Sequence, residues 1–449
     1  MFLLWHIGAK SPFSFCGDFN NSVFLKLCNM PNIVIIPKEL LTRHSIYVKM
    51  NKRVANYSKK VTVLRLRHIV YPHNIRYCKQ ASPGVRIIMK KRENGLDLLR
   101  LIAAFLVVFG HEISTYKNLY EKAAETAGGM AADFSVWVIG FARAQIWAVD
   151  AFFMLSGAFV LSSAKTTDFG GFYKNMRAKL VRPTVIFSIF FFVVMTLMNI
   201  MFGMPFGTAL YYEVQKTLTG RPADHMWYMF VLIGMYLCAP FIKAGKDLLG
   251  QKGFEKAAVF AFVWGILSLV AQPQEYDWST GKIAGLLGMF MLGNVIHDRL
   301  GDKKDNKLGA AVLCLGILST VIVMILYVHK NIMYDCPAVL GFRLTDVAHP
   351  LTALGGAAFF TAFHLLDVKK DMFKSAELTF YIYLVHPFMQ IVVELFSRGI
   401  FKTPDSVYGT PMCAAAIIIS SIVCYALSML ASMIIVNGKN KKKAAGKPA

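Results

Sequence analysis

After residue 93, long apolar runs alternate with short polar loops along the chain. A helix needs about 17 to 20 apolar residues to cross a bilayer, and several of the runs lie near the lower end of that range. The pattern predicts an all-α fold, a polytopic transmembrane helical bundle of about ten spans. The predicted spans are residues 96–111, 146–163, 184–203, 226–242, 257–271, 283–296, 308–328, 349–366, 378–396 and 411–436.

Lysine and arginine are concentrated in every second loop between these runs. Cytoplasmic loops of membrane proteins carry more positive charge than loops on the other side. We therefore place the segment before the first span inside, and an even number of spans then predicts that both termini are cytoplasmic. We expect a multi-pass protein of the inner (plasma) membrane. The basic loops lie at 165–182, 243–256, 299–307 and 369–374, and a basic tail follows at 439–447.

The overall composition agrees with a membrane protein, since 56% of the 449 residues are hydrophobic and only 17% are charged. A net charge of +23 would suggest a nucleic-acid partner in a soluble chain. Here the charge lies at loop ends, beside anionic lipid headgroups, so we expect membrane lipid as a partner and no nucleic acid. The eight cysteines show no CxxC or Cys/His spacing, so neither a disulfide framework nor a metal site is expected.

Residues 1–88 differ from the rest of the chain. They hold fourteen Lys and Arg against two acidic residues and show no sustained helical or strand period. We expect a non-native extension upstream of a start at Met89, or else a disordered basic arm on the inner leaflet. The predicted organisation is therefore residues 1–88 as this extension or arm, 89–436 as the membrane domain and 437–449 as a basic cytoplasmic tail.

Arg100 and His111 share one apolar helix in the first predicted span. Eleven steps of about 100° make almost three whole turns, so both side chains face the same way, roughly 16 Å apart along the axis. Ionisable groups inside a span are costly and usually functional. The pair predicts a site where a cation holds the charged end of an anionic donor and an imidazole acts as base at its reactive end. The alternatives are an arginine that snorkels to the surface and an interfacial histidine bonded to backbone.

The second predicted span contains Asp150, Ser156 and Gly157 in an aromatic-rich run. A Ser-Gly pair in a membrane helix is typical of close helix packing, which is one interpretation of Ser156 and Gly157. Asp150 is expected towards the outer side, where it pairs with Arg143 or faces the cavity that holds His111.

The loop before the third predicted span carries Arg177, Lys179 and Arg182. Such cations are either an ordinary anchor on the positive side of the membrane or a clamp for the phosphates of a cytoplasmic donor.

Two later motifs place polar rings within spans. Trp227 lies two residues after His225 at the start of the fourth predicted span, where an aromatic is an ordinary belt residue. Tyr383 and His386 precede Pro387 in the ninth, where proline frees backbone carbonyls, so a buried histidine there is either structural or catalytic. We assign Asp150, Ser156, Trp227, Tyr383 and His386 to the acceptor side or to the cavity around His111.

Over about residues 93 to 436, these motifs in this order resemble the acyltransferase-3 family of integral membrane acyltransferases, which modify cell-surface and exported glycans. The chain looks most similar to the enterobacterial common antigen O-acetyltransferase branch. The motifs are Asp97-x-x-Arg100 with Arg-x10-His111, Asp150-x-Phe-Phe-x-x-Ser156-Gly157, Trp227-Tyr228 and Tyr381-x-Tyr383-Leu-x-His386-Pro387.

The resemblance implies acetyl-CoA or another acyl-CoA as co-substrate, Arg100 as a donor-binding residue and His111 as the catalytic histidine, with no metal. It also implies an RxxR pair near the third span, where this chain has Lys179-x-x-Arg182 or the wider Arg177/Arg182 pair. The expected function is O-acyl transfer, with acetyl as the first choice, from cytoplasmic acyl-CoA to a hydroxyl of a cell-surface or lipid-linked polysaccharide. Direct transfer and an acyl-histidine intermediate remain open. The alternative is a transporter or flippase for an anionic or lipid-linked sugar, disfavoured because the two halves show no obvious repeat.

Overall fold

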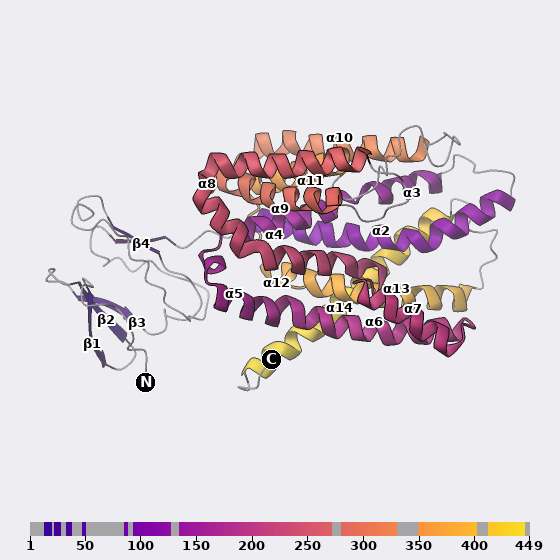
Figure 1. Ribbon diagram of the computed structural model, residues 1–449, viewed down its shortest axis with the longest axis horizontal. Helices are drawn as coiled ribbons and strands as arrows, with labels where there is room; N and C mark the ends of the chain where they lie inside the picture. Colours follow the sequence, from indigo (N-terminus) through magenta and orange to yellow (C-terminus); the bar gives the residue numbers. More distant parts are fainter. Residues whose placement is uncertain are drawn as a thin grey trace. The chain divides into compact units, whose positions relative to one another are not determined.

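The computed structural model divides the chain into two compact units, Met1–Arg92 and Glu93–Ala449 (Figure 1). Each unit is described by itself. The residues that the structure describes are 13–19, 22–27, 33–37, 47–50, 85–88, 93–126, 134–271, 280–329, 349–401 and 412–444.

The described residues of the first unit form two small antiparallel sheets. One sheet has the order β1-β2-β3 and the other pairs β4 with β5. We predicted no regular elements in this region, and its assignment as a non-native extension or a basic arm stays a prediction. The strands are β1 (Phe13–Phe19), β2 (Ser22–Leu27), β3 (Ile33–Pro37), β4 (Tyr47–Met50) and β5 (Val85–Ile88).

The described part of the second unit is built from helices, which confirms the predicted all-α class (Figure 1). In chain order the helices are α2 (Asn94–Thr126), α3 (Phe134–Ala144), α4 (Trp147–Leu161), the 3-10 helix η2 (Ala164–Thr167), α5 (Phe169–Met176), the π-helix η3 (Arg177–Val181), α6 (Arg182–Met201), α7 (Phe206–Leu218), the 3-10 helix η4 (Asp224–Met226), α8 (Trp227–Ala271), α9 (Thr280–Leu300), α10 (Asn306–Val328), α11 (Pro350–Leu365), α12 (Phe373–Ala376), α13 (Thr379–Phe401) and α14 (Met412–Ala444).

Each predicted apolar run falls on one of these helices. The runs at 226–242 and 257–271 lie on the two arms of α8, which are two helices joined by a sharp bend at Gly250. Gly250 has a φ of 66°, which glycine adopts readily and other residues adopt at a cost. The sequence therefore located the helices and correctly placed a break between these two runs, within the predicted basic loop at 243–256.

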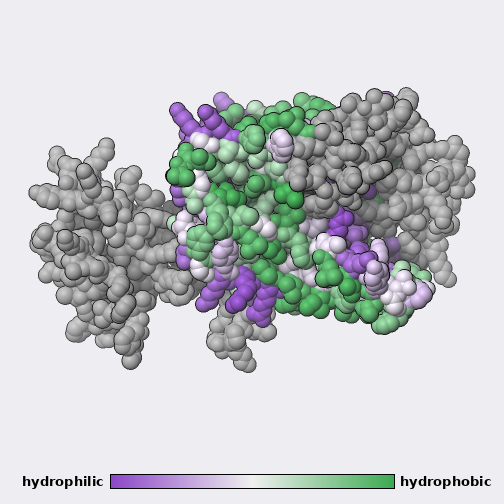
Figure 2. Space-filling model, viewed as in Figure 1, coloured by the Kyte–Doolittle hydropathy of each residue, from purple (hydrophilic) through white to green (hydrophobic). Residues whose placement is uncertain are grey.

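Six helical segments among the described residues are long and apolar enough to cross a membrane. They carry rows of exposed aliphatic and aromatic side chains, and Figure 2 shows hydrophobic residues over much of the described surface on the face in view. Exposed apolar side chains on helices this hydrophobic face lipid. The chain is thus a multi-pass membrane protein, while the predicted count of ten spans and the cytoplasmic termini stay predictions. Clear examples are Ile186, Ile189, Val193 and Leu197 on α6 and Leu315, Leu318, Ile322 and Ile325 on α10.

Helix α4 lies at the centre of the bundle, where it packs against α2, α8, α9 and α11. Ten of its residues are buried. Gly157 of α4 and Gly293 of α9 let the two helices approach closely, because a Cβ on Gly157 would lie 1.7 Å from the Phe290 carbonyl oxygen. The interpretation of Gly157 as a packing residue is confirmed, and α4 can hold Ser156 and Phe159 inside the bundle.

Candidate active site

Helix α2 carries Arg100 and His111, as predicted from their spacing. The guanidinium Nη1 of Arg100 donates a 2.7 Å hydrogen bond to Asp97 Oδ1, one helical turn earlier, and its Cζ lies 4.5 Å from the centre of the Phe159 ring. A guanidinium has five N–H donors, and this bond uses one of them. The side chain is 28% exposed, so it is accessible to a ligand while Asp97 and Phe159 hold it in place.

Three histidines from separate elements meet at His111. The ring of His111 lies 5.2 Å from that of His386 on α13 and 6.3 Å from that of His225 in η4, measured between ring centres. The rings of His225 and His386 are 5.1 Å apart. Sequence reasoning assigned His386 to the cavity but did not select His225, although it directly precedes the Met226-Trp227 start of the fourth predicted span.

Pro387 explains how the ring of His386 is oriented. Proline has no N–H, so the carbonyl of Tyr383, four residues earlier, lacks its usual helical donor. Nδ1 of His386 lies 2.7 Å from that carbonyl oxygen. A carbonyl oxygen only accepts, so Nδ1 carries the hydrogen, and in the neutral ring Nε2 then has the free lone pair.

Side chains of α13 also bond the backbone at the other two histidines. The Tyr383 hydroxyl donates to the backbone carbonyl oxygen of His225, which joins α13 to η4. Gln390 Nε2 donates a 2.9 Å hydrogen bond to the backbone carbonyl oxygen of His111, which joins α13 to α2. One face of α13 therefore holds the backbone at both His225 and His111.

Burial separates the roles of the three rings. His386 is 0% exposed and His225 is 2% exposed, whereas His111 keeps part of its surface accessible. Nε2 of His225 and Nε2 of His386 have no hydrogen-bond partner among the described residues. His111 is thus the ring of the three that can meet a substrate, and the other two form the wall behind it.

A row of hydroxyl-bearing side chains connects Arg100 with the histidines. The Ser156 hydroxyl interacts with the hydroxyls of both Tyr228 and Tyr236, and the charge of Arg100 acts on both tyrosines. The ring of Tyr228 lies 5.3 Å from that of Tyr383, which lies 5.4 Å from that of His225. Polar groups therefore continue through the apolar core between the two predicted catalytic residues.

The predicted donor-binding cations lie near the Arg100 end of this row. Arg177 and Lys179 belong to the π-helix η3, Arg182 begins α6, and all three are exposed. The preceding helix, α5, packs Phe172 on Tyr236 with ring centres 6.2 Å apart. The charge of Arg100 also acts electrostatically on Tyr236. The basic segment of Arg177, Lys179 and Arg182 and Arg100 therefore belong to one region.

Asp150 and Trp227 occupy less central positions. Asp150 is buried where α4 meets α11, and a Cβ added to Gly356 would lie 3.0 Å from the Cβ of Asp150. Trp227 lies beside Tyr228, with ring centres 6.2 Å apart. Their assignment to the acceptor side or the cavity, and the pairing of Asp150 with Arg143, stay predictions.

The helical unit matches a known family over nearly its whole length. A family model described as an acyltransferase domain covers residues 93–434, which begins at the first residue of the second unit. The chain belongs to the acyltransferase-3 family. No curated protein and no solved structure matches it. The family match shows that the protein is a membrane acyltransferase. The roles proposed for its individual residues rest on the distances, burial and hydrogen bonds of the site.

Proposed function

We propose that this protein is an O-acyltransferase that moves an acyl group, in the first instance acetyl, from cytoplasmic acyl-CoA to a hydroxyl of a cell-surface or lipid-linked polysaccharide. The observation that carries the proposal is the position of His111. It is the accessible member of a three-histidine cluster that a row of hydroxyl groups connects with Arg100. The inner (plasma) membrane is the proposed location, since it has acyl-CoA on one side and envelope glycans on the other.

The Arg100 end of the row suits the charged part of an acyl-CoA. Arginine binds phosphate oxygens through paired N–H donors, and the exposed Arg177, Lys179 and Arg182 add three further cations. The pantetheine arm of CoA is long and carries amides, so it can follow the tyrosine and serine hydroxyls inward. The thioester then lies near His111, about 16 Å along α2 from Arg100.

The chemistry at His111 is a single acyl transfer. The imidazole accepts the proton of the acceptor hydroxyl while that oxygen attacks the thioester carbonyl carbon. The new C–O bond forms, the C–S bond breaks, and the leaving CoA sulfur takes the proton from the imidazolium. Holding both substrates against one ring lowers the entropic part of the barrier. His386 and His225 act as positioning residues, because they are buried behind the reacting ring.

The acyl-ester content of the host's surface polysaccharide tests the function. We expect a deletion strain to lose an alkali-labile ester signal in the NMR spectrum of the glycan and the wild-type gene to restore it. His111→Ala, present in the membrane at the wild-type level, should not restore it. If the glycan keeps its esters in the deletion strain, the polysaccharide is not the acceptor. Acyl-CoA turnover by purified protein would then show whether a transferase with another acceptor remains.

Arg100→Ala is expected to weaken donor binding selectively. Loss of a charge-assisted hydrogen bond to phosphate removes about 1.5 to 3 kcal/mol, which corresponds to roughly a 10- to 150-fold higher KM for acetyl-CoA. Acetyl-pantetheine lacks the nucleotide phosphates, so the variant should use it as well as the wild type does. Kinetics with both donors measure this split. Arg221→Ala is the control, because it removes a guanidinium from the segment between α7 and η4 instead of from α2. An equal loss with the two donors would show that Arg100 does not bind phosphate.

A further inference from the structure

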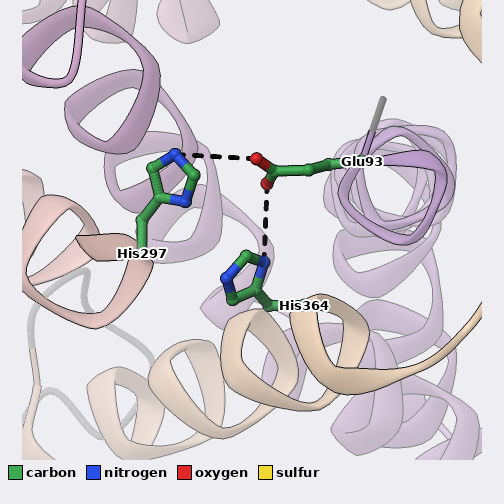
Figure 3. Close-up of side chains that lie close together, drawn as sticks. All are labelled: Glu93, His297 and His364. Carbon is green, nitrogen blue, oxygen red and sulfur yellow. Dashed lines mark ion pairs between the residues drawn. The ribbon is translucent and has the colours of Figure 1, made fainter. Parts of the chain in front are cut away.

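A second polar cluster lies at the ends of three helices, apart from the histidines around His111. Glu93 directly precedes α2, His297 lies in the last turn of α9 and His364 in the last turn of α11. Figure 3 shows the two imidazole rings turned towards the carboxylate, one on each of its oxygens. The potential ligand atoms of the three side chains all lie within 4.8 Å of one another.

The distances within the cluster leave room for a metal ion between the three side chains. His297 Nε2 lies 3.6 Å from Glu93 Oε1, and His364 Nδ1 lies 3.4 Å from Glu93 Oε2. A charge-assisted hydrogen bond between such groups would be about 2.7 to 2.9 Å long. Zinc bonds its nitrogen and oxygen ligands at about 2.0 to 2.1 Å, which places neighbouring ligand atoms of a tetrahedron about 3.3 Å apart. The observed separations, each to a different carboxylate oxygen, are longer than such a hydrogen bond and close to this second value.

Burial gives an independent reason to expect a ligand. The side chain of His364 is 0% exposed, and neither of its ring nitrogens has a hydrogen-bond partner among the described residues. A buried polar group without such a partner costs about 1 to 3 kcal/mol. A cation between His364, His297 and Glu93 would satisfy the Nδ1 of His364 and remove much of that cost.

We propose that Glu93, His297 and His364 bind a divalent transition-metal ion, with Zn²⁺ as the ion that this donor set suits best. Two neutral imidazoles and one carboxylate are common zinc ligands, and water supplies the fourth. The ligands come from three elements separated by many residues, so no Cys/His spacing could reveal them. This proposal replaces the expectation of no metal and does not depend on the identity of the acyl donor or acceptor.

The position of the cluster indicates a structural role. His111 is about 27 Å from Glu93 by the rise of α2, so the ion would not touch the reacting groups. It would join the beginning of α2 to the ends of α9 and α11. Phe159 contacts both sides, since its ring lies 5.9 Å from that of His297 and 4.5 Å from the Arg100 guanidinium carbon. The ion would therefore help to hold the helix end that positions Arg100.

Metal content of the purified full-length protein tests the proposal. The protein is prepared without a histidine tag, loaded with Zn²⁺ or Co²⁺, and freed of loosely bound ion by gel filtration. We expect about one equivalent per chain in the wild type and an intense Co²⁺ d–d absorption, which is typical of four-coordinate geometry. His364→Ala and His297→Gln should lose both, while the exposed His329→Ala should keep both.

Two results would overturn the proposal. One is a wild-type protein that retains neither Zn²⁺ nor Co²⁺ after loading, in which case the three residues form an ion-pair cluster. The other is equal retention by all four proteins, which would place the metal elsewhere. If His364→Ala is unstable, His297→Gln decides the question, because glutamine keeps most of the volume and changes the ligand.

Discussion

His111→Ala is expected to reduce acyl transfer by about a hundred- to ten-thousand-fold, the usual contribution of a positioned general base. His111 is the partly exposed ring of the three-histidine cluster, so its loss removes the group that can reach the acceptor hydroxyl. The KM for acyl-CoA should change little, because Arg100 and the basic segment lie at the other end of the row. Release of free CoA thiol by purified protein, with acceptor present, measures both parameters.

The buried partners of His111 supply the control for this experiment. His386→Ala also lowers the rate, but by a different route, because it leaves the Tyr383 carbonyl without the donor that Nδ1 provides. His386→Asn restores an N–H donor and should recover part of the activity, whereas His111→Asn should not. If His111→Ala keeps its activity while both His386 variants lose it, His386 is the base and His111 is not.

Local sequence patterns predicted the elements that carry the site. The ten apolar runs fall on helices, and the spacing of Arg100 and His111 placed both on one helix because a helix repeats every 3.6 residues. Pro387 also carried local information, since a missing N–H four residues after Tyr383 implies a free carbonyl. The polar segment at 243–256 was predicted as a loop between two spans, and the structure interrupts the helix there, at Gly250.

Contacts between distant elements could not be read from the sequence. His225 and His386 are far apart along the chain, and their meeting with His111 depends on how η4, α2 and α13 pack together. The same holds for Glu93, His297 and His364, whose spacing matches no metal motif. Each of these histidines taken alone resembles an ordinary buried or interfacial residue, and only packing distinguishes them from such residues.

Gly157→Leu is expected to prevent α4 and α9 from packing and to remove most of the folded protein. A Cβ on Gly157 would lie 1.7 Å from the carbonyl oxygen of Phe290, and one on Gly293 would lie 2.1 Å from that of Met154. Both obstacles are backbone atoms, which cannot move aside as a side chain does. Overpacking of a buried site costs about 1 to 3 kcal/mol, and a leucine against the backbone of α9 belongs at or above the upper end.

Thermal unfolding in detergent, followed by size-exclusion chromatography, measures this effect. Gly234→Ala is the matched control, because Gly234 lies within α8, is exposed and has no atom within 4 Å of the added Cβ. The milder Gly157→Ala variant should still fold, with a lower melting temperature than the wild type. Its activity should fall by more than its stability. Its Cβ pushes α4 away from α9, and α4 carries Ser156 beside the tyrosines and Phe159 beneath Arg100. A Gly157→Ala protein with wild-type stability and rate would show that the two helices do not pack at the distance described.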